Sequence, residues 1–143
     1  MKLSVQGLNS YYGPAHILFD VALEVGDGEV VALLGRNGAG KSTTFRSIVG
    51  LVEQREGQII FEGQDVSKQP THAIVRNGLG YVPEERRIFT DLTVEENLEV
   101  GRQPPRSNAP QWTREKLFAL FPNLGEMRSR MGGRMSGGEQ QML

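Results

Sequence analysis

Apolar and polar residues alternate in two segments near the start of the chain, residues 3–7 and 19–25. Alternation with a period of two is typical of strands that bury one face. Residues 30–34 are instead continuously apolar, which predicts a strand covered on both faces at the centre of a sheet. Shorter apolar segments predict two further strands, at residues 58–61 and 79–82.

Four segments have helical patterns: residues 41–49, 71–76, 93–100 and 112–121, the last ended by Pro122. In the first of them, Phe45, Ile48 and Val49 fall on one helical face. Thr93 and Glu96 predict a capping box, in which each side chain accepts a hydrogen bond from the other residue's backbone amide.

The order of these elements divides the chain into two parts. Residues 1–85 are rich in strands, and residues 86–143 are mostly helical. The clearest loop, residues 102–111, carries three prolines. We therefore expect an α/β protein with a strand-rich core followed by a helical subdomain.

The composition excludes several classes of protein. Sixteen Lys and Arg stand against 17 Asp and Glu, a formal net charge of -1, so we expect no nucleic-acid partner. The chain has no cysteine, which excludes disulfides and Cys-ligated zinc. No apolar run approaches the ~18 residues of a membrane span, and the start does not resemble a signal peptide. We expect a cytosolic protein that meets a membrane only through a partner.

Residues 35–42 match the phosphate-loop pattern G-x-x-x-x-G-K-[ST] in full. Glycines let the backbone amides turn toward a polyphosphate, and a helix that begins at the lysine adds its positive end. The pattern assigns Lys41 to the β- and γ-phosphates and Ser42 to Mg²⁺. The residues expected to bind ATP here are Gly35, Asn37, Gly38, Ala39, Gly40, Lys41, Ser42 and Thr43. A turn without a ligand is the alternative, but the apolar strand before it and the helix after it favour the phosphate loop.

A second glycine-rich segment lies near the end of the sequence, where Ser136 and Glu139 predict another capping box. Taken alone, this pattern indicates only the start of a helix. Residues 135–140, however, resemble the L-S-G-G-x-Q signature of the ABC ATPases, with Met135 in the place of leucine. Ser136 follows Lys41 by 95 residues, which is similar to the spacing in compact transporter ATPases of that family.

The resemblance implies the P-loop NTPase core of an ABC ATPase, with N-terminal antiparallel strands and a helical subdomain. It also implies that Ser136, Gly137, Gly138 and Gln140 bind, in trans, the γ-phosphate of ATP held by a second ABC ATPase subunit. Two such subunits would meet head to tail around ATP and Mg²⁺.

Two further positions match the family. Tyr12 lies 23 residues before Gly35, where ABC ATPases place an aromatic ring on adenine. Tyr11 is its neighbour, and the sequence leaves open both the choice between them and a tyrosine that only fills a strand edge. Glu84 stands where the family has the glutamine of its Q-loop, so the resemblance implies a second Mg²⁺ ligand beside Ser42.

The residues around these motifs narrow the resemblance. Residues 78–89 and 92–98 are similar to the ATPases of branched-chain amino-acid (Liv-type) importers, especially the shorter of their two ATPase subunits. Residues 11–18 are also similar to urea and short-chain amide importers. The resemblance implies permease subunits, a periplasmic or extracellular solute-binding protein, and a peripheral place on the cytoplasmic face of the inner membrane. The solute does not follow, because the permease and the binding protein select it.

The catalytic groups of the family are missing from the sequence. In ABC ATPases an apolar strand ending in Asp-Glu and a switch histidine follow the signature, and residues 137–143 contain neither. We therefore expect the front part of a longer ATPase that binds ATP, is inactive alone and leaves apolar strand edges open to self-association. A DNA-maintenance ATPase is an alternative, but the spacing lacks a coiled coil; a small-molecule kinase would leave the signature unexplained.

Overall fold

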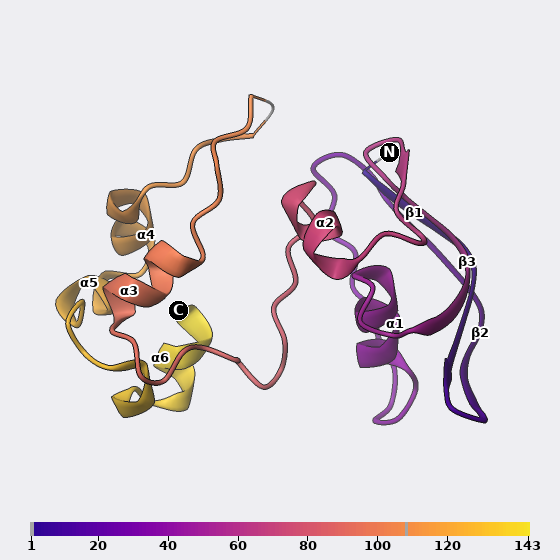
Figure 1. Ribbon diagram of the computed structural model, residues 1–143, viewed down its shortest axis with the longest axis horizontal. Coiled ribbons are helices and arrows are strands. Elements are labelled where there is room, and N and C mark those ends of the chain that lie inside the picture. Colours follow the sequence, from indigo (N-terminus) through magenta and orange to yellow (C-terminus); the bar gives the residue numbers. More distant parts are fainter. Residues whose placement is uncertain (1, 108) are drawn as a thin grey trace. The chain divides into compact units, whose positions relative to one another are not determined.

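The computed structural model describes residues 2–107 and 109–143 (Figure 1). The chain forms two compact units, the first ending at Tyr81 and the second spanning Val82–Leu143. The boundary between the two units, after Tyr81, lies shortly before the boundary expected at residue 85. Each unit has its own buried cluster of apolar side chains.

The first unit contains an antiparallel sheet of four strands in the order β2-β1-β3-β4. Its elements are β1 (Leu3–Tyr12), β2 (Ala15–Val25), α1 (Lys41–Ile48), β3 (Gln54–Phe61), β4 (Gln64–Asp65) and α2 (Thr71–Arg76). Five of the predicted elements are thereby confirmed: the strands at residues 3–7, 19–25 and 58–61 and the helices at residues 41–49 and 71–76. α1 lies against β1 and β2 (Figure 1). The core comprises Leu3, Val5, Leu8, Leu18, Ile48, Ile59, Phe61, Val66 and Ile74.

A bulge at Gly7 changes which positions of β1 face the core. Leu3 and Val5 are buried, but beyond the bulge the buried residues are Leu8 and Ser10. The pairing with β2 shifts between Val5 and Leu8, and Gly7 has a φ of +62°. An extra residue in one strand moves all following side chains by one position. The buried face therefore passes from odd to even residues, which simple alternation does not predict.

A second irregularity, at Asp20, corrects the expected face of β2. The alternation places Phe19 in the core with Val21, but Leu18 is buried and Phe19 is 66% exposed. Asp20 has a φ of 48°, a left-handed conformation that interrupts the period of two. Val21 packs against the core as expected.

Residues 30–34 do not form the buried central strand that their apolar run predicts. They have no regular secondary structure, and Val30 and Leu34 are 95% and 87% exposed. The strand expected at residues 79–82 is missing as well. A strand covered on both faces needs hydrogen-bonded neighbours, and in the described part of the chain neither segment belongs to the sheet. The apolar pattern thus predicts a burial that requires partner strands.

The second unit is built from short helices. They are α3 (Val94–Val100), α4 (Arg114–Leu120), α5 (Pro122–Glu126), the 3-10 helix η1 (Gly132–Arg134) and α6 (Gly137–Met142). The buried core consists of Val94, Phe118, Leu124 and Met135. Pro122 ends α4 as predicted, but it also begins α5, because proline suits the first turn of a helix. Trp112 lies before the N-cap Thr113, outside α4, and is 60% exposed.

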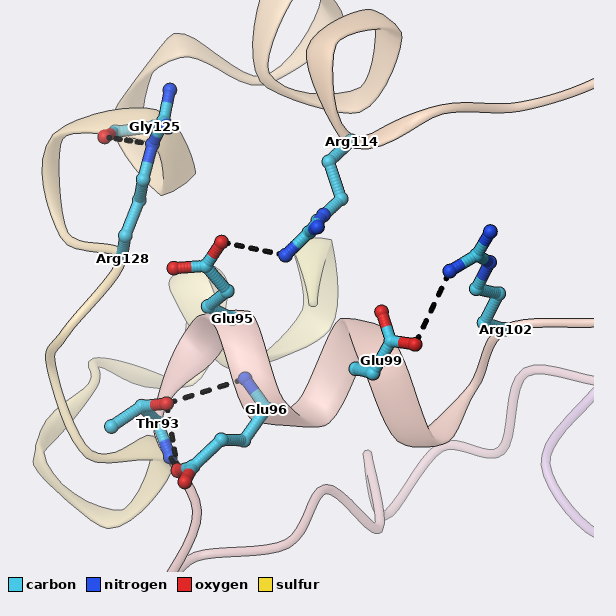
Figure 2. A network of polar contacts seen from close by, with 8 residues as sticks. All are labelled: Thr93, Glu95, Glu96, Glu99, Arg102, Arg114, Gly125 and Arg128. Atoms are coloured by element: carbon cyan, nitrogen blue, oxygen red, sulfur yellow. Dashed lines mark hydrogen bonds and ion pairs between the residues drawn. The ribbon is translucent and has the colours of Figure 1, made fainter.

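Polar contacts fix the start of α3 and tie it to α4 (Figure 2). The predicted capping box is confirmed: Thr93 N donates to Glu96 Oε2 at 2.8 Å, and Glu96 N donates to Thr93 Oγ1 at 3.2 Å. The amide of Thr93, followed by its hydroxyl, lowers the pKa of Glu96. Arg114 at the start of α4 donates to Glu95 at 2.7 Å, which joins the two helices.

We predict that Gly57→Ala destabilises the first unit. Gly57 has a φ of +107°, and an added Cβ would lie 2.5 Å from the carbonyl oxygen of Gly7 on the neighbouring strand. Backbone strain and this overlap together should lower the free energy of unfolding by about 3 kcal/mol. Unfolding in urea, followed by circular dichroism, measures the loss.

Gly63→Ala is the matched control. Gly63 also has a positive φ, +79°, but an added Cβ meets nothing within 4 Å. Only the conformational cost of about 1 kcal/mol is expected there. Equal losses in the two variants would contradict the role assigned to the contact between the strands.

Candidate functional site

α1 begins at Lys41, as the phosphate-loop pattern predicts. Its N-cap residue, Gly40, has a φ of +89°, and an added Cβ there would lie 2.7 Å from Leu18 Cδ2. Glycine therefore permits both the left-handed turn and the close approach of the loop to β2. Because Gly40 has no side chain to cap the helix, the first amides of α1 are left for another acceptor.

The side chain of Lys41 folds back over the loop that precedes it. Its ammonium group donates to the carbonyl oxygens of Gly35 and Arg36, both at 2.8 Å. Ala39 N donates to the same Arg36 carbonyl at 3.1 Å and closes the turn. The positive charge is thereby held beside the loop backbone, where an anion bound by the loop amides gains a charge-assisted hydrogen bond.

Buried hydroxyl groups attach α1, and with it the loop, to the sheet. Ser10 Oγ on β1 and Ser47 Oγ on α1 lie 2.7 Å apart, and both residues are fully buried. Thr44, also buried, donates to the carbonyl of Gly40 at 2.9 Å. The face of α1 that meets β1 therefore carries Thr44 and Ser47 together with Ile48. Phe45, which the helical pattern groups on one face with Ile48 and Val49, is exposed, whereas Ile48 and Val49 are buried.

The other predicted phosphate-binding residues lie on the same stretch of backbone. Asn37, Gly38 and Ala39 are exposed in the turn before the helix. Ser42 is exposed on the first turn of α1, and Thr43 is half-buried. The structure thus brings the predicted loop residues together at the start of α1.

The two tyrosines at the end of β1 lie on opposite faces of the sheet. Beyond the bulge, Ser10 faces α1, and the alternation of the strand puts Tyr12 on that same face. Tyr11 faces the other way, and its ring stacks on His16 with 4.3 Å between ring centroids. Tyr12 is 45% exposed. Tyr12 therefore lies on the face of the sheet that carries the phosphate loop.

The two residues expected to bind a metal belong to different units. Ser42 lies in the first unit, whereas Glu84 is an exposed residue of the second. The structure therefore does not bring them together within one unit. Across residues 2–107 and 109–143, no group of three or more His, Asp or Glu side chains is arranged to hold a metal ion.

The predicted capping box at the start of α6 is confirmed. Ser136 N donates to Glu139 Oε2 at 2.7 Å, and Glu139 N donates to Ser136 Oγ at 3.3 Å. The amide of Ser136, followed by its hydroxyl, lowers the pKa of Glu139. Gln140 donates to the carbonyl of Gly132 at 2.9 Å. The side chains of the signature thus hold their own helix in place.

Arg86 packs against the signature, which the sequence does not reveal. Its guanidinium lies so close to Gly137 that an added Cβ there would overlap a guanidinium nitrogen. Arg86 and Arg87 have φ values of 63° and 51°. This left-handed conformation is costly for residues other than glycine, and no sequence pattern predicts it at two successive arginines. The contact between Arg86 and the signature therefore could not be predicted from the sequence.

Comparison with known proteins decides the family. The family model described as ABC transporter matches residues 18–143. The chain belongs to the ABC transporter family. A solved structure titled "Structure of ATP binding subunit of ABC transporter" is 32% identical with a TM-score of 0.79, covering 99% of this chain and 59% of that one. The expected α/β fold of an ABC ATPase is confirmed. Among the described residues, no helix is long and apolar enough to cross a membrane.

Two curated relatives of this ABC protein carry different names. The chain is 43% identical over 141 residues to "High-affinity branched-chain amino acid transport ATP-binding protein BraG" of Pseudomonas aeruginosa, covering 99% of this chain and 60% of that one. It is 41% identical over 143 residues to "Lipopolysaccharide export system ATP-binding protein LptB" of Haemophilus influenzae, covering 99% and 59%. The chain spans about 60% of the length of these relatives. The two names share an ATP-binding role and differ in the transported substrate.

Proposed function

We propose that the chain binds Mg-ATP at its phosphate loop, as part of the ATP-binding subunit of an ABC transporter. The observation that carries this proposal is the Lys41 ammonium, held by the carbonyls of Gly35 and Arg36 at the start of a helix without a side-chain cap. A phosphate group arriving there meets the ammonium, the loop amides and the positive end of α1 together. The ATP-binding names of the relatives support the same nucleotide.

Each part of the nucleotide has a proposed contact. The backbone of residues 35–43 surrounds the phosphates, with Lys41 at the β- and γ-phosphates. Tyr12, on the same face of the sheet, stacks on adenine. Mg²⁺ fits the exposed Ser42 hydroxyl, because hydroxyl and phosphate oxygens are the hard ligands that it prefers. Glu84 is an exposed carboxylate, and we propose it as a further Mg²⁺ ligand.

The signature belongs to a second ATP site. We propose that Ser136, Gly137, Gly138 and Gln140 contact the γ-phosphate of ATP bound to another ABC ATPase subunit, in a head-to-tail dimer.

Hydrolysis is assigned to the longer proteins of the family. In the 143-residue sequence no apolar strand ending in Asp-Glu follows the phosphate loop, so we expect binding without turnover.

For the transported substrate we propose branched-chain amino acids, taken up through membrane permease subunits and a solute-binding protein. The chain then lies peripherally on the cytoplasmic face of the inner membrane. This choice is supported by the 43% identity to BraG and by a second relative, a LivF protein of Archaeoglobus fulgidus, at 36%. Lipopolysaccharide export is the second candidate, because the LptB relative is 41% identical over 143 residues.

Lys41→Ala should abolish most nucleotide binding. Removing the ammonium eliminates a charge-assisted hydrogen bond to phosphate, which should raise the Kd for a fluorescent ATP analogue at least about tenfold. Lys68→Ala removes an exposed lysine elsewhere in the same unit and serves as control. Equal affinity in the Lys41→Ala and Lys68→Ala proteins, or steady phosphate release by the unmodified chain that Lys41→Ala abolishes, would contradict the proposal.

The choice between the tyrosines is tested by two single substitutions. Tyr12→Ala should weaken binding of the ATP analogue about tenfold, because a purine loses its stacking partner. Tyr11→Ala should leave the Kd unchanged, since its ring stacks on His16 on the other face. The reverse order of effects would assign adenine to Tyr11.

Chimeric proteins distinguish the two substrates. Residues 1–143 replace the matching segment of BraG in one chimera and of LptB in another. We expect the BraG chimera to restore leucine uptake in cells that lack BraG, while the LptB chimera fails to support lipopolysaccharide export. A functional LptB chimera with an inactive BraG chimera would favour export.

A further inference from the structure

Asn97 on α3 uses its whole side chain to hold the loop in front of that helix. Its Oδ1 accepts from Phe89 N at 2.9 Å, and its Nδ2 donates to Phe89 O at 3.0 Å. The same Nδ2 lies 3.2 Å from Leu92 O and 2.9 Å from Thr93 O. A half-buried amide that bonds both backbone groups of Phe89 fixes residues 89–92 more tightly than the helix cap alone does.

The loop held by Asn97 is in turn paired with the segment before the signature. Gly132 N donates to Leu92 O at 2.8 Å, and Gly133 N donates to Thr90 O at 2.9 Å. The contact is close: a Cβ added at Gly132 would lie 2.8 Å from the carbonyl oxygen of Phe89. The position of residues 132 and 133 therefore depends on the position of residues 89–92.

The hydrogen bonds continue from residues 132 and 133 to the signature itself. Gly132 receives a hydrogen bond from Gln140 of α6 on its carbonyl while its amide is bonded to the loop. Leu92 O accepts from both Asn97 and Gly132. An unbroken series of hydrogen bonds thus runs from Asn97 through Leu92 and Gly132 to Gln140.

We propose that Asn97 is a positioning residue for the signature. It places the segment of the proposed trans site, residues 136–140, by fixing the loop that follows Glu84, so that this loop and the signature move as one body. This role rests on the proposed function of the signature, but the physical link from Asn97 to Gln140 can be measured without it.

Asn97→Ala tests the link in the 143-residue chain by amide hydrogen exchange and the NMR signals of the Gln140 side chain. We expect exchange at Gly132, Gly133 and the amides of α6 to accelerate about tenfold, because the loop loses several hydrogen bonds. The Gln140 side-chain amide signals should move toward their free positions. Exchange in the α4 and α5 core, for example at Leu124, should stay slow.

Asn123→Ala, an exposed asparagine on α5, is the control and should change none of these values. Faster exchange at Phe89 with unchanged Gly132, Gly133 and α6 would overturn the proposal, because the loop would then be held by Asn97 without positioning the signature.

A second variant covers the case in which Asn97→Ala unfolds the whole unit. Gln140→Met keeps the length of the side chain but removes the donor to Gly132. The proposal expects faster exchange in α6 alone, with the Asn97 side-chain signals in place; unchanged α6 exchange would overturn it. Binding of the fluorescent ATP analogue is measured in the same samples. Its failure in the unmodified chain would refute the proposed function, while the exchange data would still decide the role of Asn97.

Discussion

The buried hydrogen bond between Ser10 and Ser47 determines where the candidate site lies. It joins β1 to α1 at a point from which solvent is excluded, so an unpaired hydroxyl there would be costly. With α1 fixed, its first residue, Lys41, lies beside the loop that leads into the helix and donates to two carbonyls of that loop. The same strand then places Tyr12 on the α1 face. The geometry of the site thus follows from one attachment of a helix to a sheet.

Features encoded in a few neighbouring residues could be predicted from the sequence. Both capping boxes, at Thr93 and Ser136, form as predicted, because their hydrogen bonds join residues three positions apart. The helix start at Lys41 follows from the loop pattern for the same reason. Predictions of features that depend on distant residues were wrong. Val30 and Leu34 are exposed where the apolar run predicted a buried strand, and the irregularities at Gly7 and Asp20 change which residues of β1 and β2 face the core.

The second unit shows the same division between local and distant information. The resemblance of residues 135–140 to a signature was visible in the sequence, but the groups that hold that segment were not. Asn97 and Arg86 lie far from the signature along the chain, and they reach it through hydrogen bonds and packing that only the fold creates. Membership of the ABC transporter family explains why a phosphate-loop segment and a signature segment occur in one chain. The contacts that Asn97 and Arg86 make within the second unit explain how the signature keeps its place.

We propose that the loop closed by Lys41 is a phosphate-binding site. The most direct measurement is a titration of the isotopically labelled chain with Mg-ATP, followed by the backbone amide signals in NMR spectra. We expect one saturable set of shifts at residues 38–43, with the amides of α4 and α5 unchanged. Saturable shifts confined to other residues, or no shift at residues 38–43 at millimolar nucleotide, would contradict it.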